Sequence, residues 1–428
     1  MLVQFTIENF CSFKDEHTIS FLASSDKSLL EENTFSVNDK TRLLRTTVLY
    51  GANASGKSNL FKALHFFLSY AVDSGPRMQQ GDPIRVIPFL FSKETADAPS
   101  SFELVFYLKA NESEPIRYRY GYTVSKDHII EEHLFAINVL REVMLFTREG
   151  QTITSNPTWF KEGKNIKQDM VRENATFLSV CAQANGTISG KIIGYFRSIW
   201  ILSGQAGFPP FTMMMEDEKQ LHDKILKFLH FADLQIDDFK KKDMSLELDP
   251  EIPDNDFREF LKKKSANGGH SVKLAFAHAL YEGTQKTGEH YLPEEQESTG
   301  TQKLFEYAGV IIKALEQGSI LFVDEFDASL HPLIVENLVK LFNSPKDNPH
   351  NAQLVISCQS VHIMTNRIFR RDQIWFCEKD RYGASDLYSL LDFDEHVRKD
   401  ASYNKNYLNG KYGAVPFVDE IRLHMDRA

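Results

Sequence analysis

The chain has 428 residues, of which 42% are hydrophobic and 25% are charged. These values are typical of a globular protein, and the length allows one large domain or two to three modules. The formal net charge of −10 argues against broad, nonspecific coating of nucleic acid, although it is compatible with a local basic patch.

The cysteines and the N-terminus indicate the compartment. The four cysteines are widely spaced and form no CxxC pair, which predicts neither a disulfide framework nor a zinc site. The first residues lack the basic region and long apolar run of a signal peptide. No segment approaches the roughly 20 apolar residues of a membrane span. We therefore expect a cytoplasmic protein that does not contact a membrane.

The first third of the chain predicts a strand, a glycine-rich loop and a helix, followed by more strands. Residues 3–8 alternate as in a strand, and residues 46–50 (TTVLY) form a short β-branched run. Apolar residues then recur at helical spacing from Leu60 to Ala71, which predicts a helix with one apolar face. Residues 84–160 predict mostly antiparallel strands. Residues 1–160 are therefore expected to form an N-terminal lobe.

The middle of the chain predicts a mainly helical insertion over residues 161–270. Residues 165–198 and 215–265 are expected to be helical, and the second segment carries lysine runs at 240–242 and 262–264. Charge runs next to aspartates are usually solvated faces.

The last part, residues 271–428, is expected to be a C-terminal lobe that opens with a hairpin. An α/β pattern follows, with a helix, a strand, a helix and two strands over residues 301–317, 319–324, 333–342, 353–357 and 373–377.

A phosphate-binding loop lies between the strand at 46–50 and the helix that follows. The residues from Gly51 to Ser58 match GxxxxGK[ST]. Backbone N–H groups of such a loop cradle phosphates, its lysine reaches the β- and γ-phosphates, and its serine binds Mg²⁺. A chance match is the alternative, and the strand–loop–helix context weighs against it. The predicted nucleotide-binding residues are Gly51, Ala52, Asn53, Ala54, Ser55, Gly56, Lys57, Ser58 and Asn59, with Ser58 also a metal ligand.

An acidic pair ends a second buried strand. In the segment SILFVDE, four apolar residues precede Asp324 and Glu325. Carboxylates at the carboxyl end of such a strand lie where ligands bind. We expect Asp324 to hold the metal and Glu325 to polarise the attacking water as a general base. The alternative is a solvated strand exit.

The segment EQESTGTQ precedes the helix that leads to this strand. Ser298, Gly300 and Thr301 are suited to binding a γ-phosphate through a hydroxyl, backbone N–H groups and the helix dipole. The alternative is an ordinary helix cap at Ser298 or Thr299.

The order of these motifs resembles that of ABC-type ATPases of the SMC, RecF and Rad50 kind. FxIENFxSF, GANASGKSNL, FVDEFDASLHP and YLNGKYGAVPF are more closely similar to the AbiLi-type, or AAA15, bacterial ATPases, which are associated with abortive infection and other anti-phage systems. The resemblance implies an α/β fold, namely an ABC-type P-loop ATPase head with a mixed sheet, antiparallel β-hairpins and an inserted helical subdomain. It also implies ATP and Mg²⁺ as cofactors.

The resemblance further implies a composite site. The phosphate loop and acid strand of one protomer would bind ATP, and the Ser298–Gly300 segment of another would close over the γ-phosphate in a head-to-tail dimer. Asp327 and Ser329 would lie in the loop between the two sites.

Two features depart from the family pattern. Such ATPases often carry a histidine after the next strand, where this chain aligns Gln359, and His362 is an alternative in another register. Glutamine can orient water but cannot accept its proton, which favours slow hydrolysis or a binding switch. The glutamine usual between the lobes has no clear counterpart, since Gln79 and Gln80 lack supporting context.

The leading hypothesis is an ATPase that switches or scaffolds a defence system and controls a separate effector, such as a nuclease. The second is a DNA-repair ATPase that clamps DNA, with DNA or RNA bound by the lysine runs. A standalone nuclease is the third.

Overall fold

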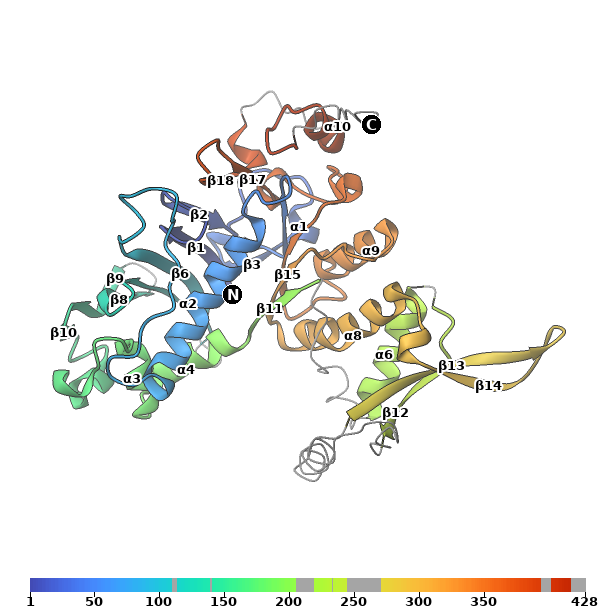
Figure 1. Ribbon diagram of the computed structural model, residues 1–428, viewed down its shortest axis with the longest axis horizontal. Coiled ribbons are helices and arrows are strands. Elements are labelled where there is room, and N and C mark those ends of the chain that lie inside the picture. Colours follow the sequence, from blue (N-terminus) through green and yellow to red (C-terminus); the bar gives the residue numbers. More distant parts are fainter. Residues whose placement is uncertain are drawn as a thin grey trace, which may run out of the picture. The chain divides into compact units, whose positions relative to one another are not determined.

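The computed structural model describes residues 1–109, 114–138, 141–204, 219–232, 234–244, 271–393 and 402–416. The chain divides into two compact units. The first contains residues 1–205, 314–328 and 335–428, and the second contains residues 206–313 and 329–334 (Figure 1). Within the described residues, no helix is both long and apolar enough to cross a membrane.

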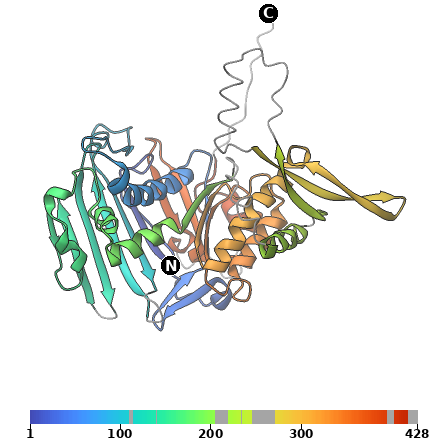
Figure 2. The same ribbon diagram turned by 90° about the horizontal axis from the view of Figure 1, so that it is seen from below.

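A seven-stranded antiparallel sheet, in the order β10-β9-β8-β7-β6-β1-β2, forms one layer of the first unit (Figure 2). Alternation explains its strands: Tyr118, Tyr120 and Tyr122 are buried, whereas Arg117 and Arg119 point to the opposite face. The hairpins predicted within residues 84–160 are present. The strands are β1 (Leu2–Glu8), β2 (His17–Ser20), β6 (Ser100–Leu108), β7 (Ile116–Val124), β8 (Ile129–Asn138), β9 (Arg141–Glu149) and β10 (Thr152–Ser155).

A six-stranded sheet, in the order β11-β15-β16-β5-β17-β18, carries the predicted site. Its strands are parallel except for the β17–β18 hairpin. The central strands β5, β15 and β16 are buried along almost their whole length, as expected of parallel strands covered on both faces. The predicted fold class is therefore confirmed. The strands are β5 (Thr46–Tyr50), β11 (Ile199–Ser203), β15 (Ile320–Asp324), β16 (Gln353–Ser357), β17 (Ile374–Lys379) and β18 (Ser385–Ser389).

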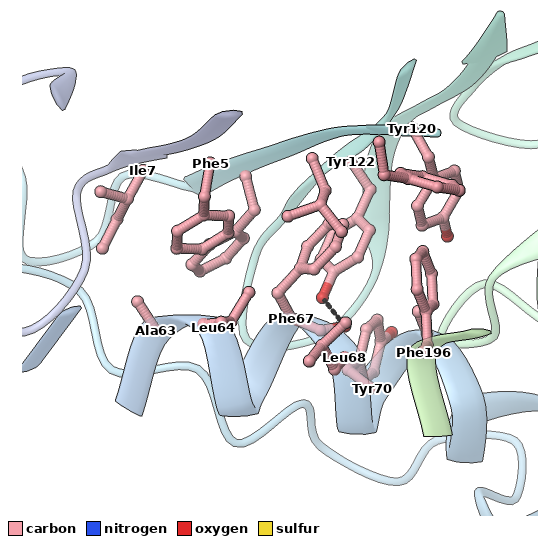
Figure 3. Packing of buried hydrophobic residues seen from close by; sticks show 14 of the residues in the cluster. Phe5, Ile7, Ala63, Leu64, Phe67, Leu68, Tyr70, Tyr120, Tyr122 and Phe196 are labelled. Carbon is pink, nitrogen blue, oxygen red and sulfur yellow. Dashed lines mark hydrogen bonds between the residues drawn. The ribbon is translucent and has the colours of Figure 1, made fainter. Parts of the chain in front are cut away.

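Helix α2 (Lys57–Arg77) packs against both sheets. Figure 3 shows Phe67 next to Phe5 and Tyr122, with ring centroids 5.8 and 5.1 Å away, and the Tyr122 hydroxyl donating to the Phe67 carbonyl (3.0 Å). One turn and a half earlier, Phe61 contacts Phe322 of β15 at 5.7 Å. Burial of each phenylalanine side chain adds roughly 1.5–3 kcal/mol to the free energy of unfolding. This packing fixes the helix that begins directly after the phosphate loop.

The remaining elements of the first unit are short or connect the sheets. They are α1 (Leu30–Asn33), the β3–β4 hairpin (Thr34–Asn38 and Thr41–Leu44), η1 (Lys161–Asn165), η2 (Gln168–Met170), α3 (Phe177–Gln183), α4 (Thr187–Arg197), η4 (Val361–Ile363), η5 (Arg371–Gln373), η6 (Leu390–Asp392) and α10 (Tyr403–Leu408). Helix α9 (Pro332–Asn343) begins in the second unit and ends in the first.

The second unit contains a three-stranded antiparallel sheet in the order β12-β13-β14. Phe305 packs against Phe239 and Phe276, with centroids 5.0 and 5.1 Å away. The unit comprises α6 (Lys219–Phe231), β12 (Asp238–Met244), β13 (Ser271–Glu282), β14 (Gln285–Pro293), η3 (Glu294–Gln296) and most of α8 (Thr299–Gln317).

The prediction of helix over residues 215–265 was only partly right. Helix α6 lies within that segment, but residues 238–244 form strand β12, and residues 245–265 lie outside the described residues. The strand forms because the segment pairs with β13, from Asp238 opposite Ala277 to Met244 opposite Ser271. Such pairing is tertiary and overrides local composition.

Candidate nucleotide-binding site

The phosphate loop occupies the turn between β5 and α2, as predicted. Gly56 has φ of 120°, and a Cβ on it would lie 2.2 Å from the Ser385 Oγ. A Cβ on Gly51 would lie 2.2 Å from the Cys377 carbonyl oxygen. Both glycines of the motif are therefore required by close packing around the loop and by their backbone conformations, with φ of 154° at Gly51 and 120° at Gly56.

The loop is held from outside by neighbouring chain segments. The Ser55 carbonyl accepts a hydrogen bond from Ser385 Oγ (2.6 Å) and from Cys377 Sγ (3.2 Å). Ser12, from the N-terminal FxIENFxSF segment, accepts from Asn59 Nδ2 (2.8 Å) through its hydroxyl and from the Ser385 N–H (2.7 Å) through its carbonyl. The serine of that segment therefore helps to fix the phosphate loop.

The asparagine of the same segment has a structural role that the sequence did not reveal. Asn9 Nδ2 donates to the carbonyls of Thr95, Ala98 and Pro99, each at 3.0 Å, and its Oδ1 accepts from the Phe89 N–H at 2.9 Å. One buried side chain thus organises a surface loop. These partners are more than 75 residues away in the chain, so no local pattern points to them.

Lys57 links the phosphate loop to the acidic strand end. Its Nζ donates to the carbonyls of Gly51 (2.7 Å) and Ala52 (3.0 Å), and the residue is 7% exposed. Burial lowers the pKa of Lys57, and the negative charges of nearby acidic groups, including Asp324 and Glu325, partly oppose that effect. Strands β15, β16 and β5 are parallel neighbours, so the acidic strand ends at the same edge of the sheet as the phosphate loop.

The acid pair is held by Ser357, at the end of β16. Its Oγ donates to Asp324 Oδ1 (2.5 Å) and accepts from the Glu325 N–H (2.7 Å), while its carbonyl accepts from the Phe326 N–H (3.0 Å). Glu325 has φ of 53°, in the left-handed region that non-glycine residues rarely adopt. Ser357 was not among the predicted residues, although a residue ending a neighbouring parallel strand is a reasonable candidate.

Asp327 connects the acidic loop to the residues after β16. Its Oδ2 accepts from the N–H groups of Gln359 (3.0 Å) and Ser360 (2.6 Å). The backbone of Gln359 is therefore fixed next to this loop. His362 instead lies with its Nε2 3.8 Å from Glu336 Oε2. Its position is that of a surface residue paired with α9.

The predicted γ-phosphate segment lies in the second unit. The Ser298 Oγ accepts from the Thr301 N–H (3.1 Å) and is 2.8 Å from the Thr301 Oγ1, so Ser298 caps α8. A Cβ on Gly300 would lie 3.2 Å from the Ser329 carbonyl oxygen. The structure therefore places two predicted segments, Ser298–Thr301 and Ser329, side by side, and their role in binding stays a prediction.

Strand β11 adds an element that the sequence did not reveal. It pairs in parallel with β15, with Ser203 opposite Asp324. The residue after Gly204 is Gln205, which lies outside the described residues.

Residues 46–179 and 214–365 match a family model described as "AAA domain, putative AbiEii toxin, Type IV TA system". The match spans more than half of the chain. The chain belongs to this family. The resemblance to bacterial P-loop ATPases of defence systems is thereby confirmed at the family level. No curated protein matches the sequence.

Solved structures with a similar arrangement share little sequence with this chain. The SMC head domain from Thermotoga maritima is 13% identical, with a TM-score of 0.40 over 91% of this chain and 98% of that one. CbiO1 from Clostridium perfringens, part of the ABC transporter complex CbiONQ, is 11% identical, with a TM-score of 0.33 over 96% and 92%.

The residues at the loop fit ATP and Mg²⁺, the ligands expected of a P-loop family. The Ser55 Oγ is buried without a hydrogen-bond partner, Lys57 lies on loop carbonyls, and Ser58 is half-buried in the first helical turn. A hydroxyl and a carboxylate, from Ser58 and Asp324, are hard oxygen ligands of the kind that Mg²⁺ takes together with substrate phosphates. In the described part of the chain, no group of three or more His, Cys, Asp or Glu side chains could hold a metal alone.

Replacing Lys57 with alanine should abolish tight MgATP binding, because the β- and γ-phosphates lose the cation of the loop. Isothermal titration calorimetry measures the loss directly. Lys62→Ala, on an exposed position of the same helix, is the matched control and should bind ATP as the wild type does. Unchanged affinity in Lys57→Ala would remove the assignment of the loop.

Proposed function

We propose that this chain is an ATP-binding and ATP-hydrolysing switch of a bacterial abortive-infection-type defence system. It dimerises around ATP and controls a separate effector protein. The observation that carries this proposal is Lys57, which is buried against the phosphate loop and lies within electrostatic reach of Asp324 and Glu325. Family membership supports the link to defence.

Different residues of the first unit bind the phosphates, hold the metal and activate the attacking water. The N–H groups of Gly56, Lys57 and Ser58 face the phosphates, and Lys57 exchanges its loop carbonyls for phosphate oxygens. Mg²⁺, held by Ser58 and Asp324, would neutralise charge on the phosphates. Glu325 orients the attacking water and accepts its proton.

The residues after β16 favour slow hydrolysis. Gln359 is held by its backbone N–H on Asp327 and can orient water, but it cannot accept a proton. A slow turnover lengthens the ATP-bound state. The rate of hydrolysis therefore sets the lifetime of the ATP-bound dimer, which is the form that a partner recognises.

Replacing Glu325 with glutamine should leave ATP binding intact and slow hydrolysis by about 10²–10⁴-fold, the usual contribution of a general base. The variant should also accumulate ATP-bound dimers, measured by light scattering. Glu149→Gln, on an exposed strand end, serves as the control. Wild-type turnover in Glu325→Gln would exclude Glu325 as the general base.

Replacing Gly300 with aspartate tests the site completed by a second protomer. The carboxylate would place negative charge against the γ-phosphate, so we expect ATP to bind at the loop while hydrolysis and ATP-dependent association are lost. The readout is turnover over a range of protein concentrations. Gly288→Asp is the matched control in the second unit, since a Cβ there has open space. If Gly300→Asp hydrolyses ATP normally at every concentration, the segment is only a helix cap.

The effector hypothesis and the DNA-clamp alternative predict different results in a binding experiment. The ammonium of Lys240 lies 3.4 Å from the Tyr291 ring centroid, and Lys262–Lys264 lie outside the described residues. In the presence of ATP, but not of ADP, we expect the Glu325→Gln variant to co-elute with the protein encoded next to it. A salt-sensitive shift of duplex DNA, without such co-elution, would favour the DNA clamp.

A further inference from the structure

Gly204, which follows strand β11, contacts the backbone of the acid pair Asp324 and Glu325. The Gly204 N–H donates to the Asp324 carbonyl at 2.6 Å. A Cβ on Gly204 would lie 2.1 Å from the Glu325 carbonyl oxygen and 2.9 Å from the Glu325 carbonyl carbon. Both distances are shorter than real Cβ contacts, and the atoms met are backbone, which cannot rotate away.

The same backbone is held on its other side. The Glu325 N–H donates to Ser357 Oγ, and the residue has φ of 53°. The Glu325 main chain is thus fixed on two sides. Its N–H is hydrogen-bonded to Ser357, and its carbonyl packs directly against Gly204. The next N–H, that of Phe326, is also held, by the Ser357 carbonyl, so a displacement of the Glu325 carbonyl cannot be taken up by ψ alone. It also changes φ, which redirects the bond from Cα to Cβ.

We propose that Gly204 is a positioning residue for Glu325. Its lack of a side chain allows the Glu325 carbonyl to remain where the left-handed conformation places it, and this aims the carboxylate at the water. The inference rests on the proposed ATPase function. The backbone of Gly204 is not in the left-handed region, so the requirement is for space alone, and any other residue could adopt the same φ.

The requirement for space makes alanine a specific probe. A single added methyl group should displace the Glu325 peptide while leaving the phosphate loop and Lys57 intact. Misplacement of a catalytic group by an ångström can cost about 10²-fold in rate. We therefore expect Gly204→Ala to lower kcat by at least about 10-fold, with an unchanged ATP dissociation constant.

The test compares four proteins in single-turnover ATP hydrolysis: the wild type, Gly204→Ala, Glu325→Gln and the double variant. If Gly204 acts through Glu325, the double variant should be no slower than Glu325→Gln alone, because the misplaced group is already inactive. A further loss that multiplies the two single effects would mean a general structural role and would overturn the proposal. Gly194→Ala in α4, where a Cβ has open space, is the matched control.

Two further results distinguish failure of the proposed function from failure of the inference about Gly204. A wild type without ATP turnover would refute the proposed function, whereas normal turnover in Gly204→Ala, with Glu325→Gln slow, would refute only this inference. If Gly204→Ala does not fold, as judged by circular dichroism, Ser357→Ala at saturating Mg²⁺ tests the same enclosure from its other side. A kcat equal to wild type in that variant would also overturn the proposal.

Discussion

The hydroxyl of Ser357 is the contact on which the arrangement of the site depends. Strands β5, β16 and β15 are parallel neighbours, so their carboxyl ends meet at one edge of the sheet. At that edge one hydroxyl donates to Asp324 and accepts from the Glu325 N–H. Hydrogen bonds to charged groups contribute about 1.5–3 kcal/mol each, and a buried group left unpaired costs a comparable amount. The acid pair therefore has one favoured arrangement before any ligand binds.

Lys57 completes this arrangement from the start of α2, after strand β5. A buried ammonium is costly unless it is hydrogen-bonded, and here two loop carbonyls accept from the Lys57 ammonium. The carbonyls are neutral acceptors that phosphate oxygens can replace. The loop itself keeps its shape during that exchange, because its outer side is fixed by Ser385, Cys377 and Ser12. The Lys57 ammonium can therefore bind phosphate without a change in the conformation of the loop.

The sequence was sufficient wherever the determining information is local. The phosphate loop, the helix after it and the buried strand ending in Asp324 are encoded in contiguous segments, and the structure has them at those positions. Strand β12, Asn9, Ser357 and Gly204 depend on partners far along the chain, so neither composition nor spacing reveals them. Ser298 illustrates the intermediate case, because a helix cap and a phosphate ligand require the same residue at the same place.

The connections of the second unit lead to the same acid pair. The chain leaves the first unit after Gln205, directly beyond Gly204, and re-enters it within α8, whose next strand is β15. Strands β11 and β15 are paired neighbours, and each ends at the Asp324–Glu325 peptide, one through the Gly204 contact and one through the chain itself. The two strands that flank the inserted segment along the chain therefore converge on one backbone position of the first unit. Glu325 occupies a disfavoured conformation at that position, and such a conformation persists only because the surrounding contacts, from Ser357 on one side and Gly204 on the other, fix the backbone.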